Sequence, residues 1–551
     1  MIKTILCFWL LTVGALSSGR AQAPVWAWAT TPIPFAAADE ARPNCAALDH
    51  AGNVLVTGYL VGRATFGSFT LTGSSAQGQD GFIGKLSPTG QWLWVAQAPL
   101  GFITSVVADG AGGAFVNGTF VGTATFGATQ LTSVGQADVF VARVSASGQW
   151  LWATSFGGPG YDGNTRVQSD AAGNVWLSAS FSGQVSVGAQ QLSSAGATDV
   201  LVGKLSAVGQ WLWAVSAGGP DFDGASAFAL DGSGNAVVAG NFRSQASFGT
   251  TLLTNQGMVG GDVFVAKISD TGQWLWANRA GGPSPIGCGA ALATGQGETV
   301  VTGFFRGNAT FGSTLLNGLP SGSSTLYVAR LSAMGQWQGT ASVTNASGNA
   351  LGLDANGNVL VAGQIEGGAT FGNTTLACAG ASDGFVAQLP NNGQWGWALG
   401  VGGAGADYCA TLSADRLGNV AVTGTFQRAM TLAGNSFTNQ TLYGYGGFVA
   451  RIMGAALSTA TTGLAESGLT VYPNPINTNQ TKCRVHLKLS APASSKVQVV
   501  NLLGQQVAMC VPVAAAGFAE VDLPQLSAGV YHVLATGSDG RALGKTTLVV
   551  E

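Results

Sequence analysis

A unit of about sixty residues recurs along most of this chain and constrains its fold more than any other feature. Its marker is the tetrapeptide Gln-Trp-Leu-Trp, which appears four times and has shorter variants elsewhere. The first Trp of each copy follows the previous one after 58 to 66 residues, at Trp26, Trp92, Trp150, Trp211, Trp274, Trp337 and Trp395. These markers divide residues 24–453 into seven units.

Each unit contains the same parts in the same order. After Trp-x-Trp come a Gly-Gly loop, a turn of the form Asp-x-x-Gly-Asn, the segment Ala-Thr-Phe-Gly and the segment Asp-x-Phe-Val-Ala-Lys. The apolar runs are four to eight residues long and are bounded by Gly, Asn, Asp or Ser, which is typical of strands. We expect four strands per unit: the Trp-x-Trp, Gly-Asn-Val-x-Val-x-Gly, Phe-Gly-x-x-x-Leu and Phe-Val-Ala-Lys-Leu segments. Seven such modules predict an all-β fold, a seven-bladed β-propeller.

The two ends of the repeated region complement each other. The last unit stops at Phe448–Ile452 with no Trp-x-Trp after it, and the first begins with an unmatched Trp26-Ala27-Trp28. An open ring would leave unpaired strand edges, which folded proteins avoid. We therefore predict that the N-terminal strand completes the last blade.

The repeat has a family resemblance. The residues that carry it are Asp231, Gly234-Asn235, Val237, Gly240, Asp262–Lys267, Gly272 and Gly281-Gly282. On these residues the chain resembles the SBBP-type bacterial β-propeller family over roughly Val25–Met453. It departs from the family in its Gln-Trp-Leu-Trp motif and in unit five, where Thr294 and Thr325 replace the two aspartates. The resemblance implies a propeller and no single activity.

Composition excludes several classes of protein. The 551 residues include 84 Gly and are only 9% charged, but 46% are hydrophobic, with 15 Trp and 26 Phe, which is enough to fill a core. The formal net charge is −3, and the sequence contains no Lys/Arg cluster, so we expect no nucleic-acid partner.

The first 23 residues read as a secretory signal peptide. Lys3 provides the positive charge, Ile5–Leu16 the apolar stretch and Ala21-Gln22-Ala23 the cleavage pattern. The mature chain has no apolar run of about 18 residues, so we expect no transmembrane segment. Export places the cysteines in an oxidising compartment, where Cys483 and Cys510 could pair while the others could be buried thiols. Spacing of the C-x-x-C type is missing from Cys45, Cys288, Cys378, Cys409, Cys483 and Cys510, so a zinc site is not expected.

A second domain follows the repeats. Residues 454–467 form a linker of small polar residues, and residues 468–551 change in composition. Lys482–Leu489 alternates polar and apolar residues, and further short runs predict a small β-sandwich of six or seven strands.

Three blocks in this domain carry a resemblance of their own, Leu469–Pro475, Asn501–Gln505 and Leu526–Tyr531. On these blocks the domain resembles the type IX secretion C-terminal sorting domain (type A) of Bacteroidetes-type bacteria. The resemblance implies that residues 468–551 are recognised by the type IX secretion machinery and removed after export. It also implies a protein that is secreted or attached to the outer membrane at the cell surface.

The sequence assigns no catalytic, cofactor-binding or metal-ligating residue. The three His residues, His50, His486 and His532, have no partner at metal or triad spacing. One aspartate series occupies the turn that precedes the Gly-Asn-Val segment: Asp49, Asp109, Asp170, Asp231, Asp354 and Asp415. A second begins a strand: Asp80, Asp138, Asp199, Asp262 and Asp383. Because both series repeat, we interpret them as holding turns by accepting backbone N–H groups.

Three alternatives stay open at this point. A structural calcium ion could bind the oxygen-rich loops at Asp162, Asp223 and Asp407. The Trp pairs could stack on sugars, although repetition favours packing between blades. An enzyme would need a cluster that breaks the symmetry, and the candidates are Asp39, Glu40, Arg42, Arg306 and Glu366.

Taken together, these features predict an exported monomer that acts as a binding or adhesion scaffold and is not an enzyme. The ligand would be a glycan or a protein at the propeller face. The competing readings are a secreted enzyme that degrades polysaccharide or peptide at the channel mouth, and a structural surface protein without a specific ligand.

Overall fold

All secondary structure in the described part of the chain is β-strand. The computed structural model describes residues 24–453 with gaps at 75–78, 258–260, 320–321, 416–417 and 440–443, and seven strands within 469–550. The predicted signal peptide at 1–23 and the predicted linker at 454–467 therefore lie outside the described residues. Contacts divide the chain into two compact units, and the first of them spans Ala23–Ala455.

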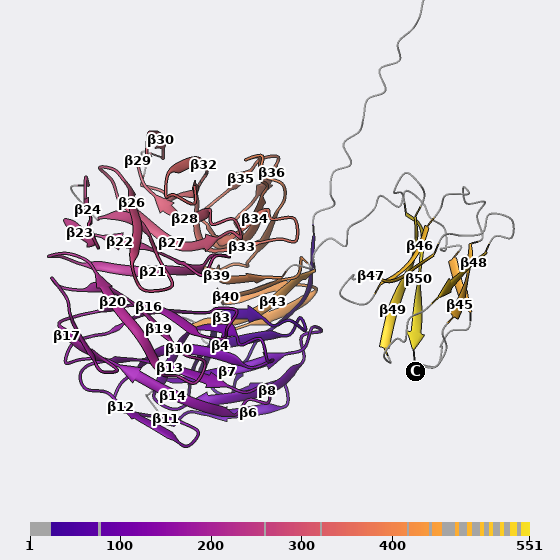
Figure 1. Ribbon diagram of the computed structural model, residues 1–551, viewed down its shortest axis with the longest axis horizontal. Helices are drawn as coiled ribbons and strands as arrows, with labels where there is room; N and C mark the ends of the chain where they lie inside the picture. The colour runs from indigo at the N-terminus through magenta and orange to yellow at the C-terminus, as the bar shows by residue number, and fades with distance from the viewer. Residues whose placement is uncertain are drawn as a thin grey trace, which may run out of the picture. The chain divides into compact units, whose positions relative to one another are not determined.

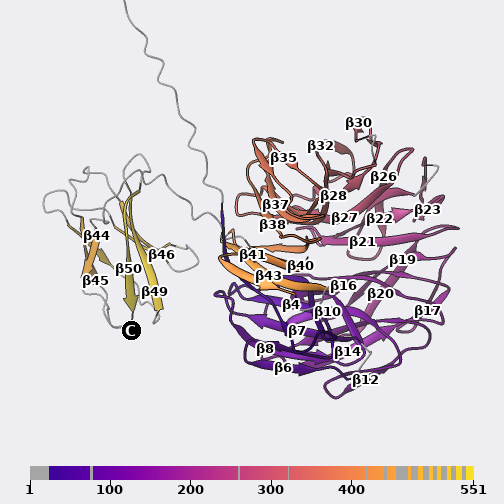
Figure 2. The same cartoon turned by 180° about the vertical axis from the view of Figure 1, so that it is seen from behind.

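The first unit consists of seven antiparallel sheets, each built on four strands (Figures 1 and 2). The first strands of the sheets are β3 (Glu40–Leu48), β9 (Gly101–Ala108), β15 (Gly163–Ser169), β21 (Asp223–Leu230), β27 (Ile286–Ala293), β33 (Ala346–Leu353) and β39 (Tyr408–Ala414). The second strands are β4 (Val54–Val61), β10 (Ala114–Phe120), β16 (Val175–Phe181), β22 (Ala236–Phe242), β28 (Thr299–Phe305), β34 (Val359–Ile365) and β40 (Val420–Gln427).

The remaining two strands of each sheet contain the motifs that recur most regularly along the chain. The third strands are β7 (Asp80–Leu86), β13 (Asp138–Val144), β19 (Asp199–Leu205), β25 (Asp262–Ile268), β31 (Thr325–Leu331), β37 (Asp383–Leu389) and β43 (Tyr445–Met453). The outer strands are β8 (Trp92–Ala98), β14 (Trp150–Phe156), β20 (Trp211–Ala217), β26 (Trp274–Gly281), β32 (Trp337–Thr344), β38 (Ala398–Val401) and β1 (Val25–Thr30).

The first strands form a closed circuit. Each contacts the first strand of the next sheet, and β39 contacts β3. The sheets radiate from this circuit, so that the indigo start of the unit lies beside its orange end (Figure 1). This arrangement is a β-propeller, which confirms the predicted all-β class.

The prediction of strands within a unit was wrong in one respect. The Phe-Gly-x-x-x-Leu segment is not in the four-stranded sheet; it forms part of a separate two-stranded hairpin. These hairpins are β5–β6 (Arg63–Phe66, Phe69–Thr72), β11–β12 (Thr123–Phe126, Thr129–Thr132), β17–β18 (Gln184–Val187, Gln190–Ser193), β23–β24 (Gln245–Phe248, Thr251–Thr254), β29–β30 (Asn308–Phe311, Thr314–Asn317), β35–β36 (Ala369–Phe371, Thr374–Leu376) and β41–β42 (Ala429–Leu432, Asn435–Thr438). The fourth strand is instead the first strand of each sheet, which has no repeated motif.

Each hairpin also connects neighbouring units. In unit five, β29 pairs with the outer strand of the preceding sheet, where Ala280 faces Phe311. At the start of the ring, β2 (Ile33–Pro34) pairs with β5 in the same way. The extra pairing covers part of an outer edge that would otherwise be open.

The N-terminal strand completes the last sheet, as the sequence predicts. Strand β1 pairs antiparallel with β43, from Val25 opposite Met453 to Thr30 opposite Val449. Trp28 on β1 also contacts the first sheet: its indole N–H donates to the carbonyl of Pro88, between β7 and β8, at 2.9 Å. The ring is therefore closed by backbone pairing and by a side chain.

The Trp pairs pack the blades, in agreement with the favoured interpretation. In five sheets the first Trp of the motif meets a Phe of the hairpin that lies between the second and third strands of the same sheet, as Trp150 does with Phe126 at 5.1 Å between ring centroids. The second Trp lies over a glycine in the turn before the outer strand of the next sheet. A Cβ on Gly148 would come within 2.8 Å of the Trp94 ring, which leaves room for glycine alone.

The first aspartate series holds the turns as predicted. Asp231 Oδ1 accepts the N–H groups of Ser233 at 2.8 Å and Asn235 at 2.9 Å. Its other oxygen forms an ion pair of 2.7 Å with Lys267 on the third strand. Lys267 also donates to the Gly297 carbonyl of the next unit, so the pair joins two blades. The turn is thus a structural element repeated around the ring.

The second unit consists of two antiparallel sheets. Strands β44 (Leu469–Tyr472), β45 (Lys482–Leu487) and β48 (Phe518–Asp522) form one, and β47 (Gln506–Cys510), β46 (Lys496–Val500), β49 (Gly529–Thr536) and β50 (Ala542–Val550) form the other. The sheets contact each other through β47 with β48 and through β44 with β50. Two contacting sheets of seven strands agree with the predicted sandwich. Cys483 and Cys510 lie on strands of different sheets, and the pairing of their side chains falls outside the described residues.

Candidate functional site

The aspartates of the loops considered for calcium act as backbone clamps. Asp223 Oδ2 accepts the Gly219 N–H at 2.6 Å, and its Oδ1 accepts the Arg243 N–H at 3.3 Å. Burial, reinforced by the neighbouring Asp199, raises the pKa of Asp223 to about 7. The equivalent Asp162 accepts N–H groups from Gly158 and Ser182.

These clamps do not resemble a calcium site. Ca²⁺ takes six to eight oxygen ligands, whereas both oxygens of each of these carboxylates already accept backbone N–H groups. No group of three or more His, Cys, Asp or Glu side chains that could hold a metal ion occurs among the described residues. Calcium binding therefore has no support beyond the sequence pattern.

Three of the residues that break the symmetry come together at the seam of the ring. Arg42 forms an ion pair with Glu40, and its guanidinium lies 5.0 Å from the centroid of the Tyr445 ring. Glu40 also accepts the Tyr59 hydroxyl at 2.9 Å, and Asp39 accepts the Ala36 N–H at 2.9 Å. The carboxylates are therefore engaged by the protein itself.

Arg306 and Glu366 do not join this group. Both follow the second strand of a sheet, in units five and six, and both are exposed. Within the described ranges, no hydrogen bond or ion pair links either of them to Asp39, Glu40 or Arg42. Of the five residues that break the symmetry in the sequence, three therefore lie together at the seam and two lie in other units.

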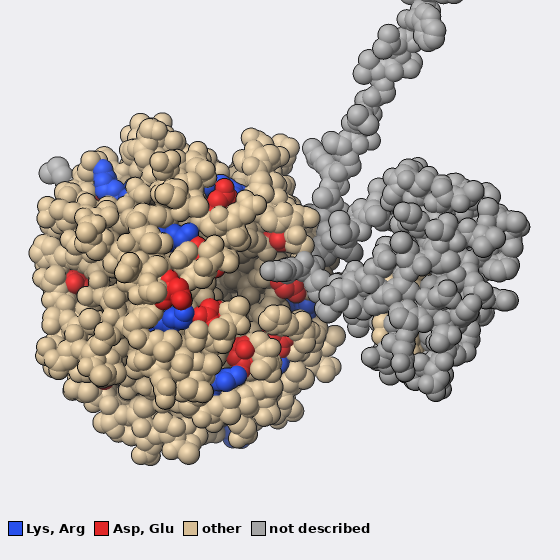
Figure 3. Space-filling model, in the orientation of Figure 1, with Lys and Arg blue, Asp and Glu red and all other residues tan. Residues whose placement is uncertain are grey.

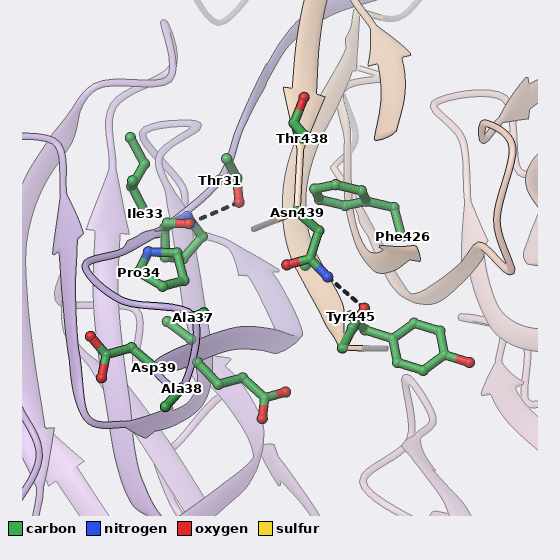
Figure 4. A pocket seen from close by; sticks show the side chains of 15 residues that line it. Thr31, Ile33, Pro34, Ala37, Ala38, Asp39, Phe426, Thr438, Asn439 and Tyr445 are labelled. Carbon is green, nitrogen blue, oxygen red and sulfur yellow. Dashed lines mark hydrogen bonds between the residues drawn. The ribbon is translucent and has the colours of Figure 1, made fainter. Parts of the chain in front are cut away.

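A cavity of about 500 Å³ lies at the seam, and we call it the seam pocket. One wall is the segment of unit one from Thr31 to Ala41, and the other comes from the last unit, with Phe426, Thr438, Asn439 and Tyr445 (Figure 4). Hydroxyl, amide and carboxylate groups stand beside apolar walls of Ile33, Pro34 and Ala38. No Lys or Arg is among its lining residues, all of which are described.

The central channel forms a second hollow, with a volume of about 410 Å³. Residues from the first strands of all seven sheets line it, together with His50. The space-filling view shows charged side chains of both signs next to one another around a hollow near the centre of this face, with a largely uncharged periphery (Figure 3). His50 has no catalytic partner in this channel: among the described residues that line it, there is no Asp, Glu or second His.

Sequence reasoning missed Arg166, which lines the channel. It also lines an adjoining cavity of about 190 Å³, together with Asn164 and Phe222. The sequence signal that could have identified Arg166 is that it differs from the small residues at the equivalent positions of the other first strands. This difference appears only when the first strands are aligned with one another. The first strands share no motif, so the alignment needs the strand register.

Comparisons with known proteins bear on the C-terminal domain and on export. Residues 470–550 match the family model described as the secretion system C-terminal sorting domain. This type IX tail indicates an exported protein, secreted or held at the cell surface, that engages the secretion machinery. The described residues include no helix of the length and apolar character needed to cross a bilayer.

Solved structures with some likeness are distant. The Dos1 propeller is 8% identical, with 77% of this chain and 95% of that chain covered and a TM-score of 0.39. PorZ, described as an essential bacterial surface component of the type IX secretion system of Porphyromonas gingivalis, is 12% identical, with coverage of 93% and 82% and a TM-score of 0.24. A protein of unknown function from Dyadobacter fermentans is 10% identical, with coverage of 78% and 99% and a TM-score of 0.35. Scores this low do not bear on function, no curated protein matches the chain, and the SBBP resemblance stays a prediction.

Proposed function

We propose that this exported propeller is a non-catalytic binding scaffold that holds a surface glycan in the seam pocket. The observation that carries the proposal is the pocket of about 500 Å³ at the seam, where the first and last units meet and the repeated pattern is interrupted. A ligand site needs such an interruption, because residues used in every unit serve the fold.

The chemistry of the lining favours a sugar. A sugar ring has hydroxyls on its edge and apolar C–H groups on its faces. Thr31, Asp39 and Asn439 line the pocket beside Ile33 and Pro34, which is the mixture of apolar wall and few polar groups that ligand sites use. The carboxylates of the lining disfavour an acidic glycan, so the ligand is neutral or carries an amino group.

Binding is favoured over hydrolysis by the state of the two acids. Glycosidases use two carboxylates that face the scissile bond, one as acid and one as base or nucleophile. Here Glu40 is held by Arg42 and by Tyr59, and Asp39 accepts an N–H of its own loop. Because Glu40 is held in this way, the pocket does not present a pair of free carboxylates.

The test uses the full chain, fluorescently labelled, on a glycan array. Thr438→Trp fills the pocket from an exposed position at the end of β42, and Thr132→Trp places the same side chain at the equivalent exposed position of β12. We expect the wild type and Thr132→Trp to bind the same neutral or amino-sugar glycans, and Thr438→Trp to lose at least tenfold in affinity.

Three outcomes would overturn the proposal. Equal binding by both variants would show that the glycan does not bind in the seam pocket. A lack of binding to any glycan would favour a structural surface protein. New reducing ends after incubation with a bound glycan would instead identify an enzyme.

A further inference from the structure

The central channel contains one residue that its symmetry does not explain. The first strand of each sheet has a bulge, and the residue that resumes the pairing after the bulge lies opposite an equivalent position of the second strand in all seven sheets. In unit three this residue is Arg166, opposite Ser178. In the other units it is small: Cys45, Ser105, Ala227, Ala290, Ala350 and Thr411. At this position six sheets therefore place a small side chain in the channel, and the third sheet places the long, charged side chain of Arg166 there.

Arg166 has no countercharge. Neither of the two cavities that Arg166 lines has an Asp or a Glu among its described lining residues. None of the ion pairs within the described ranges includes Arg166. Its one recorded hydrogen bond runs from an Nη atom to the carbonyl of Thr165 at 3.0 Å, so most of its five N–H donors remain available to a ligand. Four cations of the third strands differ from it in this respect: Lys85, Arg143, Lys204 and Lys267 each pair with an aspartate.

The channel partly shields the Arg166 side chain from bulk water without neutralising its charge. Burial lowers the pKa of Arg166, as expected for a cation without a carboxylate partner. An arginine nevertheless stays charged in a protein at neutral pH. A group in this state has a strong tendency to bind an anion, which would restore the interactions that burial removes.

We propose that Arg166 is the recognition group of an anion site in the central channel, which binds a small ligand through an oxyanion group. The planar fork of the guanidinium matches a carboxylate or a phosphate through two parallel N–H···O bonds. Asn164 and Gln168, on the same strand, also line the two cavities and can meet further polar groups of the ligand.

The size of the cavities limits the ligand. Volumes of about 410 and 190 Å³ admit a molecule of the size of a dicarboxylic acid or an acidic monosaccharide, but not a folded partner. The site is separate from the seam pocket, which has no cation in its lining and shares no residue with either cavity. The channel site therefore selects an anionic ligand, whereas the lining of the seam pocket disfavours one.

The test measures the thermal unfolding midpoint of the full chain while the anion is varied at constant ionic strength with sodium chloride. The probes are acetate, succinate, glucuronate and inorganic phosphate. We expect at least one of them to raise the midpoint of the wild type in a saturable way, and calorimetric titration of that anion to give a dissociation constant. The carboxylate and phosphate arms identify which oxyanion the site prefers.

Three variants make the test specific. Arg166→Met should lose at least tenfold in affinity and, because it removes an uncompensated charge, should unfold at the same or a higher temperature in chloride alone. Arg166→Lys keeps the charge without the planar fork and should lose affinity for carboxylates. Arg306→Met removes an exposed arginine outside the channel and should behave as the wild type does.

The proposal is overturned if no probe shifts the midpoint of the wild type. It is also overturned if Arg166→Met responds to the anion as strongly as the wild type and Arg306→Met do. Both readouts are independent of glycan binding at the seam.

Discussion

The contact between a Trp and the glycine of the next turn can be tested with a pair of glycines that differ in one respect. Gly148 and Gly393 occupy the same turn in units two and six, and their φ angles are +83° and +75°. An alanine Cβ would meet the Trp94 ring at 2.8 Å in the first case, whereas it meets nothing within 4 Å in the second. The second turn is open because Gly339, on the outer strand of the preceding sheet, takes the place of the second Trp of the motif.

The magnitudes follow from these two environments. An alanine at positive φ costs about 1–2 kcal/mol relative to glycine, and both variants share that cost. The overlap with Trp94 adds about 1–3 kcal/mol in Gly148→Ala alone. In the double variant Trp94→Ala/Gly148→Ala the overlap disappears, so the cycle should give a coupling energy of about 1–3 kcal/mol.

Equilibrium unfolding in urea of the four proteins of the cycle, together with Gly393→Ala, measures these differences. Trp94→Ala by itself should be destabilising, because it also removes the hydrogen bond from the indole N–H to Ala146, of 2.8 Å. Equal costs for the two glycine variants, or a coupling energy of zero, would refute the inference that the Trp pairs act by packing adjacent blades.

Three further predictions concern closure, charge and pH. Deleting Val25–Thr30 exposes the edge of β43 and should lower the melting temperature sharply in a calorimetric scan, and an unchanged temperature would exclude the closure. Lys267→Met leaves Asp231 buried without a countercharge and should cost about 3 kcal/mol in urea unfolding. Lys267→Gln should lower the free energy of unfolding less than Lys267→Met does, because the equivalent Gln388 in unit six donates a hydrogen bond to Asp354. A larger loss for Lys267→Gln than for Lys267→Met would contradict this explanation. Because the pKa of Asp223 is raised to about 7, its contribution to stability is complete below about pH 4 and is lost as the pH rises through 7. Asp223→Asn should flatten the slope of unfolding free energy between pH 4 and 7, and an unchanged slope would place the titration elsewhere.

The sequence was sufficient wherever a residue acts on its own neighbourhood. Asp231 and Asn235 define a turn through contacts four residues apart, and the unmatched Trp26-Ala27-Trp28 indicated how the ring closes. It was insufficient for the first strands, because their small side chains vary from unit to unit and carry no motif. That is why the Phe-Gly segment was taken for a strand of the sheet in place of β15 and its counterparts.

The sequence by itself determined the repeated module, the closed ring and the sorting tail, because each is written in local patterns that recur or match. The tertiary structure alone decided where Arg166, Glu40 and Tyr445 lie relative to the rest of the ring. Glu40 and Tyr445 are far apart in the chain and line the same pocket only because the first unit packs against the last. The isolation of Arg166 depends on what the first strands of the other six sheets place around it. Charge and ligand recognition follow from such long-range neighbours, whereas strands and turns follow from the residues beside them.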